Sequence, residues 1–235
     1  MSLVVLSSLA LKGVLEKSRR ELERSLGARL ELHFDATQAI LPRLAAGFRA
    51  DLVVLTAEAM DELRKAARVT QVRALGSSGV GVAVRAGARK PDIGSVEALK
   101  RSLVSARSVA HSKVGASGIY FVELLEKLGI AGQVKRVVVE KGPVGSVVAA
   151  GEAELGVQQL CELEPVPGID IVGPLPAPVQ KITHFSAGIP ADAANAAGAR
   201  ALMERLQLRS PSRARARAGS RPRDACGRRS RRAAW

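Results

Sequence analysis

The sequence predicts an α/β protein with two lobes, and two observations indicate this fold class. Short runs rich in β-branched residues alternate along the chain with segments of helical periodicity, a pattern typical of mixed, mainly parallel sheets. Two stretches rich in glycine, serine and proline, residues 76–95 and 175–190, enclose the middle of the chain. Such stretches are typical of connections between domains, so we expect one domain to be inserted into another, with two strands crossing between them.

Each element is predicted from its local pattern. In "YFVELLEKL", for example, apolar residues recur at helical spacing and Gly129 follows them, which predicts a helix with one buried face. The predicted strands cover residues 3–8, 30–34, 51–55, 79–85, 108–112, 135–140, 154–159, 168–173 and 183–189. The predicted helices lie near residues 10–26, 38–48, 56–67, 95–105, 117–128, 143–151 and 190–207.

The composition is that of a globular protein with a core of small aliphatic residues. Of the 235 residues, 47% are hydrophobic but only 3% are aromatic, so Ala, Val and Leu must fill most of the core. No apolar run approaches the roughly 18 residues that a membrane-spanning helix needs. The first residues also lack the pattern of a secretory signal. We therefore expect a cytoplasmic protein as the sequence stands, or a periplasmic one whose export signal is missing from it.

Cysteine and histidine are too few and too scattered to predict a metal centre. The two cysteines, Cys161 and Cys226, exclude a disulfide framework and a zinc site built on four thiolates. The three histidines show no metal-ligand spacing. We predict neither a metal site nor a cofactor.

The positive charge is concentrated at the end of the chain. Residues 208–235 hold ten of the 36 Lys and Arg residues and one of the 22 Asp and Glu residues, so they carry +9 of the net charge of +14. One interpretation is an arm that binds nucleic acid or an anionic surface, and the other is a disordered or frame-shifted tail. Because the arginines follow no structural periodicity, we predict the second and no specific nucleic-acid partner.

Four predicted strand-to-helix loops are rich in small and hydroxyl residues. They are "LSSLALK" (6–12), "HFDATQAI" (33–40), "HSKVGASGIY" (111–120) and "EKGPVGSVV" (140–148). Ligands of open α/β sheets bind at the carboxyl ends of strands, and free amides at a helix start suit an anion. Ser and Thr are also ordinary helix caps. Four such loops in one chain favour an anion site, and no nucleophile-elbow or P-loop motif competes with it.

The order of several segments resembles a known family. The segments "VVLSSLALKGVLEKS", "LHFDATQAILPRLAAGFRADLVVLT", "GASGIYFVELLEKLGI", "AAGEAELGVQQLCEL" and "PGIDIVGPLP" are similar to those of molybdate-binding-type solute-binding proteins of ABC transporters, which are type II periplasmic binding proteins. The similarity spans roughly residues 3–207. It implies lobe I from residues 1–80 and 183–207, lobe II from residues 81–182, and two hinge strands between them. It also implies a monomer that binds a small anion and delivers it to an ABC transporter permease.

The resemblance assigns ligand-binding positions as well. They are Ser7, Ser8, Ala10, Thr37, Gln38, Ser117, Gly118, Val144, Gln158 and Gln159. Gln159 departs from the family, which has a tyrosine there. Lys12, Lys113 and Lys141 flank three of the loops, either as solvated surface charges or as ligand contacts. If they are ligand contacts, a carboxylate would suit these lysines and glutamines better than molybdate would.

Two functions follow from these residues. The leading hypothesis is a solute-binding protein that captures a molybdate-like oxyanion or a small polycarboxylate between its lobes. The "GVQQ" segment also resembles a bacterial aconitate isomerase, so the alternative is an enzyme that moves a double bond in a polycarboxylate. That reaction needs a general base, for which His111, Lys113 and Asp35 are the candidates, with His111 first because it lies at a strand end facing the expected cleft. We expect binding rather than catalysis.

Overall fold

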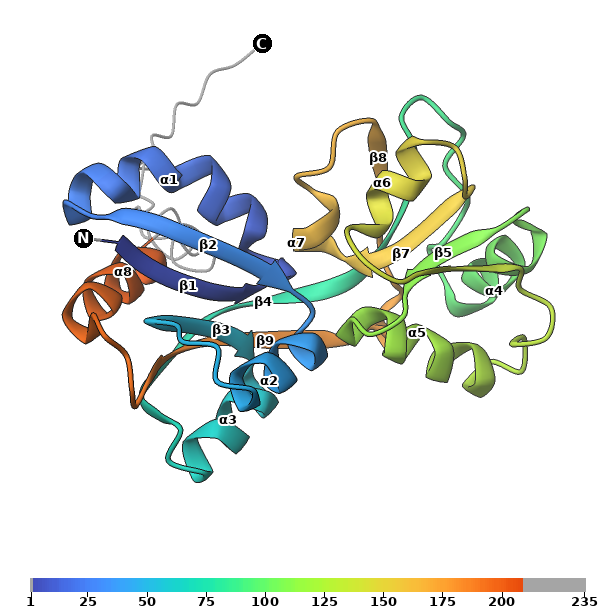
Figure 1. Cartoon of the computed structure of the whole chain (residues 1–235). Coiled ribbons are helices and arrows are strands. Elements are labelled where there is room, and N and C mark those ends of the chain that lie inside the picture. The colour runs from blue at the N-terminus through green and yellow to red at the C-terminus, as the bar shows by residue number, and fades with distance from the viewer. Residues whose placement is uncertain (1, 209–235) are drawn as a thin grey trace, which may run out of the picture.

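A computed structural model describes residues 2–208, which fold into two α/β lobes (Figure 1). Nine strands within these residues pair in the order β2-β1-β3-β9-β4-β7-β5-β6, and β8 pairs with β4 outside that order. The predicted fold class, a mixed sheet in a two-lobed molecule, is confirmed.

The first lobe is built on parallel strands closed by one antiparallel neighbour. Its elements are β1 (Ser2–Ser8), the 3-10 helix η1 (Leu9–Leu11), α1 (Lys12–Leu26), β2 (Arg29–Asp35), α2 (Thr37–Ala45), β3 (Leu52–Thr56), α3 (Ala57–Lys65), β9 (Ile182–Pro190) and α8 (Ala196–Leu208). Strand β1 lies between β2 and β3 and is parallel to both, whereas β9 is antiparallel to β3. Helix α1 ends at Gly27, whose φ of 61° lies in the left-handed region that glycine adopts without strain.

The second lobe repeats this arrangement with its own strands. Its elements are α4 (Val96–Ser105), β5 (Val109–Ser112), α5 (Ala116–Lys127), β6 (Arg136–Val139), α6 (Val144–Ala149), β7 (Leu155–Gln159), α7 (Leu160–Leu163), β8 (Ile169–Pro174) and the 3-10 helix η2 (Ala177–Val179). Strand β5 is parallel to both β6 and β7.

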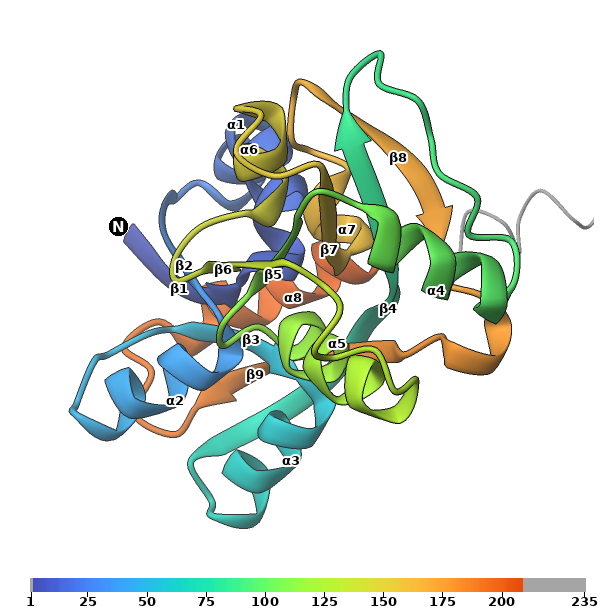
Figure 2. The same cartoon turned by 90° about the vertical axis from the view of Figure 1, so that its right-hand side faces the viewer.

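Two strands connect the lobes. Strand β4 (Val69–Arg85) pairs with β9 from Val69 to Gly79 and then with β7 from Val80 onward. Figure 2 shows β4 passing through the molecule from α3 toward β8. The change of partner between Gly79 and Val80 marks where the strand enters the second lobe. The division into lobes at residues 80 and 182 stays a prediction.

Each sheet is buried on both faces, which explains the nearly continuous apolar strands. In β1, Leu3 and Val5 face a core that includes Leu15 of α1 and Leu202 of α8. Leu6 faces the opposite core, together with residues of α2 and α3. The second lobe has one core beneath α4 and α5 and another beneath α6. Alternate side chains of a strand point to opposite faces, so both faces need apolar residues.

The structure differs from the predicted elements in three places. The first half of β4, residues 69–78, was not predicted as a strand because its glycines and serines interrupt the apolar alternation. Helix α7 was missed because four residues are too short to show a helical period. The last helix begins at Ala196 and not near residue 190, since β9 continues to Pro190 and a turn follows. The predicted basic tail, 208–235, lies outside the described residues except for Leu208.

Candidate functional site

The predicted loops lie in two neighbouring pairs, one pair in each lobe. Ser8 ends β1 beside Asp35 at the end of β2, so the first two loops are neighbours. In the second lobe Ser112 ends β5 beside Val139 at the end of β6, so the third and fourth loops are neighbours too. Helix α7 of the second lobe packs against η1 of the first. In Figure 1 the arrowheads of β1 and β2 point toward the second lobe.

The first loop contains an enclosed hydroxyl without a partner. Ser7 and Ser8 are both buried, and the Ser7 hydroxyl donates to the Ser8 carbonyl oxygen over 2.9 Å. The Ser8 Oγ atom has no hydrogen-bond partner in the structure and is shut off from solvent. Ala10 is buried in η1, directly after it. A buried hydroxyl without a partner is costly, so a ligand oxygen at this place would relieve that cost.

The second loop places Thr37 inside and Gln38 outside. Thr37 is buried at the start of α2, and its Oγ1 accepts a hydrogen bond from the Thr56 amide over 3.4 Å. Its hydroxyl hydrogen therefore remains available to a ligand. Gln38 is exposed, and no hydrogen bond of its side chain directs it toward the other loops.

The third loop explains the run of small residues before α5. Gly115 donates its amide hydrogen to Ser112 Oγ over 2.9 Å, and a side chain on Gly118 would overlap the carbonyl oxygen of Ser112. Gly118 is therefore required for the close packing of α5 on β5. Ser117 is buried as a residue, yet its hydroxyl has no protein partner and is not enclosed. The amides of Ala116 and Ser117 belong to the first helical turn, which has no partners within the helix.

In the fourth loop, a backbone amide that could bind a ligand is already hydrogen-bonded to another residue of the protein. The Val144 amide, which the resemblance assigned to the ligand, donates to Gln158 Oε1 over 2.9 Å. Gln158 is buried and passes its own amide hydrogen to the carboxylate of Glu162. These two hydrogen bonds form a series that ends at the Glu162 carboxylate, which the sequence analysis did not single out.

Gln159 faces the hinge strands. Backbone carbonyl oxygens only accept hydrogen bonds, so its amide nitrogen faces those of Ser78 and Gly79, at 2.9 and 3.2 Å. Its amide oxygen then accepts from Thr183 Oγ1 over 2.7 Å. Gln159 therefore ties the end of β7 to both β4 and β9, and its role in the structure is to hold the hinge.

Glu162 is the functional candidate that sequence reasoning missed. Its side chain is partly buried, and this desolvation raises the pKa of Glu162 to about 7 although the hydrogen bond from Gln158 opposes the shift. The available signal was a glutamate four residues after Gln158 in the otherwise apolar segment "LCEL". That spacing brings the two side chains together once α7 forms.

The candidate base His111 is enclosed. The ring lies 5.5 Å from the Phe121 ring, its Nδ1 is 3.1 Å from the Ser112 carbonyl oxygen, and its Nε2 has neither a partner nor solvent contact. Burial lowers the pKa of His111. The expectation that its side chain faces the cleft is wrong for this structure, because His111 points from β5 into the core beneath α5 with Phe121.

Two of the three flanking lysines form ion pairs with glutamates. Lys113 forms an ion pair with Glu140 at 3.0 Å, which joins the third and fourth loops, and Lys12 lies 3.9 Å from Glu16. Asp35 accepts a hydrogen bond from the Ala36 amide over 2.9 Å. Lys141 is exposed.

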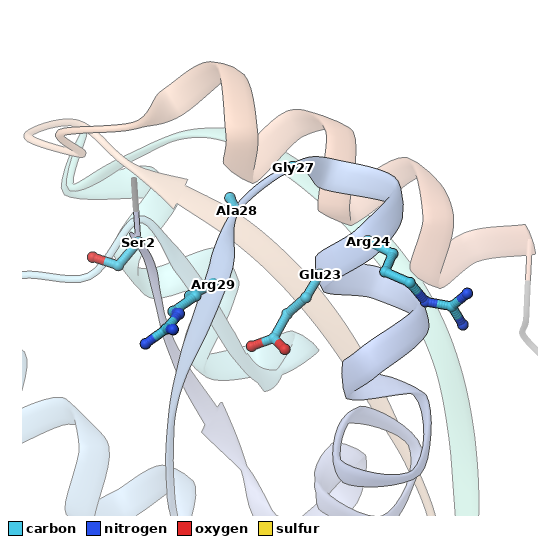
Figure 3. Close-up of a pocket in the computed structure, with 6 residues that line it drawn as sticks. All are labelled: Ser2, Glu23, Arg24, Gly27, Ala28 and Arg29. Atoms are coloured by element: carbon cyan, nitrogen blue, oxygen red, sulfur yellow. The ribbon is translucent and has the colours of Figure 1, made fainter.

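Two pockets of the structure are lined mainly by residues other than the predicted ligand contacts. One, of about 510 Å³, is lined by Ser2, Glu23 and Arg29 at the start of β1, the opposite end of the strand from Ser8 (Figure 3). Another, of about 410 Å³, lies between the lobes and is lined by parts of α1, β4, β9 and α7, with Cys161 among its residues. Burial raises the pKa of that thiol to about 12, so it stays protonated and is a poor nucleophile at neutral pH.

Comparison with known proteins identifies the family. A model of bacterial extracellular solute-binding proteins matches residues 3–218. The chain belongs to this family. This solute-binding protein is also similar in fold to the periplasmic molybdate-binding protein of Azotobacter vinelandii, with a TM-score of 0.72 and 19% identity over 88% of this chain and 93% of that one.

Two further relatives bear on the site. The substrate-binding domain of a molybdenum ABC transporter candidate from Clostridium difficile matches with a TM-score of 0.65 and 16% identity, over 90% of this chain and 94% of that one. The resemblance to molybdate-binding-type solute-binding proteins is thereby confirmed. An aconitate isomerase from a Pseudomonas species is 38% identical over 231 residues, which cover 94% of this solute-binding protein and 88% of that enzyme.

Residues 2–208 contain no group of three or more His, Cys, Asp or Glu that could hold a metal ion. Over the same range, no helix has the length and apolar character needed to cross a membrane.

Proposed function

We propose that this solute-binding protein captures a small polycarboxylate anion between its lobes and delivers it to a membrane transporter. The observation that carries the proposal is the Ser8 hydroxyl, which is enclosed without a partner where β1 passes into η1. Thr37 and Ser117 supply further free hydroxyl hydrogens from two other loops. Three hydroxyl donors and the open amides of α5 would bind carboxylate oxygens.

A carboxylate suits this set better than molybdate does. The Val144 amide is already bonded to Gln158, and the residue at the family's tyrosine position, Gln159, is bonded to the hinge. Two donors of the molybdate-type arrangement are therefore not free. Closure of the lobes would follow from contacts that the ligand makes with both of them.

A ligand screen by thermal shift tests this proposal. The protein is heated with molybdate, tungstate, sulfate, citrate, cis-aconitate or trans-aconitate at increasing concentrations. A ligand at a hundredfold its Kd stabilises the folded state by about 2.7 kcal/mol and so raises Tm. We expect the tricarboxylates to raise Tm most, because the free donors of the site suit carboxylate oxygens. A larger shift with molybdate would assign the oxyanion as ligand, and no shift with any anion would contradict the proposal.

Isomerisation of aconitate is a second candidate function. It is favoured by the 38% identity with an aconitate isomerase over nearly the whole chain and by the buried carboxyl of Glu162, whose pKa near 7 suits proton transfer at neutral pH. Incubation of trans-aconitate with the protein, followed by NMR for the cis isomer, tests it. Binding of trans-aconitate without formation of the cis isomer would contradict the isomerase function and support the binding function only.

A further inference from the structure

Helix α7 is the element that brings a carboxyl group to the junction of the lobes. It packs against η1 and α1 of the first lobe and against β7, α6 and β8 of the second. Cys161 and Glu164 line the pocket between the lobes, whereas Glu162 extends toward Gln158 and the start of α6. The Glu162 carboxyl therefore lies beside Gln158 and the fourth loop rather than in that pocket.

One oxygen of Glu162 is held and the other is free. The Oε2 atom accepts the hydrogen bond from Gln158. The Oε1 atom has no hydrogen-bond partner, yet it is not enclosed as Ser8 Oγ is. A carboxylate that is anchored through one oxygen and open at the other has the geometry of a general base, because its free oxygen can take and return a proton.

No positive charge neutralises Glu162. Only burial and the Gln158 hydrogen bond alter its pKa, and none of the ion pairs of residues 2–208 includes it. Helix α7 also carries Cys161, and Glu164 follows it directly. The elements packed against α7 carry Lys12, Glu16 and Lys17 at the start of α1, Arg73 and Arg85 in β4, and Asp170 in β8. Glu162 is therefore a partly buried carboxylate without an ion-pair partner among the described residues.

We propose that Glu162 is the general acid–base residue of this site and moves a proton between two carbons of an unsaturated tricarboxylate. The proposal rests on the second candidate function above. The Glu162 carboxylate removes a proton from the methylene carbon next to the double bond, and that C–H electron pair forms a new C=C bond. The former π pair then takes the same proton back from the Glu162 carboxylic acid at its far carbon. The double bond has shifted, Glu162 is again a carboxylate, and no other reactant is consumed.

The experiment measures proton transfer and binding separately. Trans-aconitate is incubated with the full chain in D₂O, and NMR records deuterium entering its methylene and vinyl positions as well as the cis isomer. We expect Glu162→Gln to slow exchange and isomerisation by about 10²- to 10⁴-fold, the usual contribution of general acid–base catalysis. The same variant should still show the rise in Tm with trans-aconitate, because a glutamine can keep the hydrogen bond to Gln158.

Three control variants sharpen the result. Glu162→Asp keeps a carboxyl group and should retain part of the activity. Glu164→Gln changes an exposed carboxylate directly after the same helix and should leave the activity unchanged. His111→Gln tests the enclosed histidine. The wild-type pH profile should rise as pH passes through about 7, the pKa of Glu162, and His111→Gln should keep that limb.

Each failure points to a different conclusion. If Glu162→Gln exchanges protons within a few-fold of wild type, the assignment of Glu162 is overturned while the activity stands. If wild type binds trans-aconitate but neither exchanges nor isomerises it, Glu162 is not a catalyst and the binding function stands. If no anion raises Tm, the proposed function itself fails.

Discussion

Gln158 near the end of β7 and Glu162 in α7 are four residues apart, and the Gln158 amide nitrogen donates a hydrogen bond to the Glu162 carboxylate. The other end of the same amide accepts the hydrogen of the Val144 amide at the start of α6. The Gln158 side chain therefore occupies the Val144 amide, a backbone donor of the fourth loop, and holds the Glu162 carboxyl group at the boundary of the lobes. It distinguishes this site from one built only of neutral donors for an oxyanion.

The first prediction concerns stability and pH. Burial raises the pKa of Glu162 from 4.5 to about 7, so the folded state binds more protons than the unfolded state between those values. Stability should therefore fall as pH rises from about 4.5 through 7, by on the order of 3 kcal/mol for the full shift. Glu162→Gln should lack this loss, so its urea midpoint should exceed that of wild type more at pH 8 than at pH 5. An equal difference at both pH values would contradict the raised pKa.

The second prediction concerns the unpartnered hydroxyl of Ser8. Ser8→Ala removes a buried polar group that has no hydrogen bond, so stability without ligand should be unchanged or higher. The loss of a hydrogen bond to a charged ligand should weaken binding by roughly 10- to 100-fold. Isothermal titration with the best anion of the screen measures this. Ser146→Ala, at an exposed position of α6, is the control. Unchanged affinity in Ser8→Ala would remove Ser8 from the site.

The third prediction concerns the glycine run before α5. An added Cβ at Gly118 would overlap the Ser112 carbonyl oxygen, which belongs to the backbone of β5 and moves only with the strand. Gly118→Ala should therefore destabilise the protein by about 1–3 kcal/mol, measured as a lower urea midpoint. The matched control is Gly132→Ala, where nothing lies within 4 Å of the added atom. Equal midpoints for the two variants would show that α5 does not pack as closely as described.

The fourth prediction concerns the hinge. Gln159→Leu leaves the carbonyl oxygens of Ser78 and Gly79 and the Thr183 hydroxyl without their partner, which should cost about 1–3 kcal/mol. A double-mutant cycle with Thr183→Val measures the part that belongs to the Gln159–Thr183 bond. The two substitutions should be clearly non-additive. Additive losses would mean that the two side chains do not interact.

Local sequence patterns determined most elements of this protein. Eight strands, the second half of β4 and the helices α1 to α6 lie where apolar spacing and glycine predicted them, because hydrophobic periodicity records which face of an element is buried. The four loops at the strand ends were also evident, since parallel strands bring their carboxyl ends to one edge. Helix α7 was not evident because its four residues are too few to show a helical period. The first half of β4 was not evident because glycine and serine interrupt its apolar alternation.

Tertiary structure decided which of those residues are free to bind a ligand. The family resemblance assigned Val144, Gln158 and Gln159 as ligand contacts, and the sequence analysis did not single out Glu162. In the fold Val144 and Gln158 are hydrogen-bonded to each other, and Gln159 is hydrogen-bonded to the hinge strands. Glu162, by contrast, is partly desolvated and has one oxygen without a hydrogen-bond partner. A hydrogen bond depends on distances between segments far apart in the chain, such as the one between Gln159 and Thr183. Spacing along the sequence carries no record of those distances, so it identified the loops but not their free donors and acceptors.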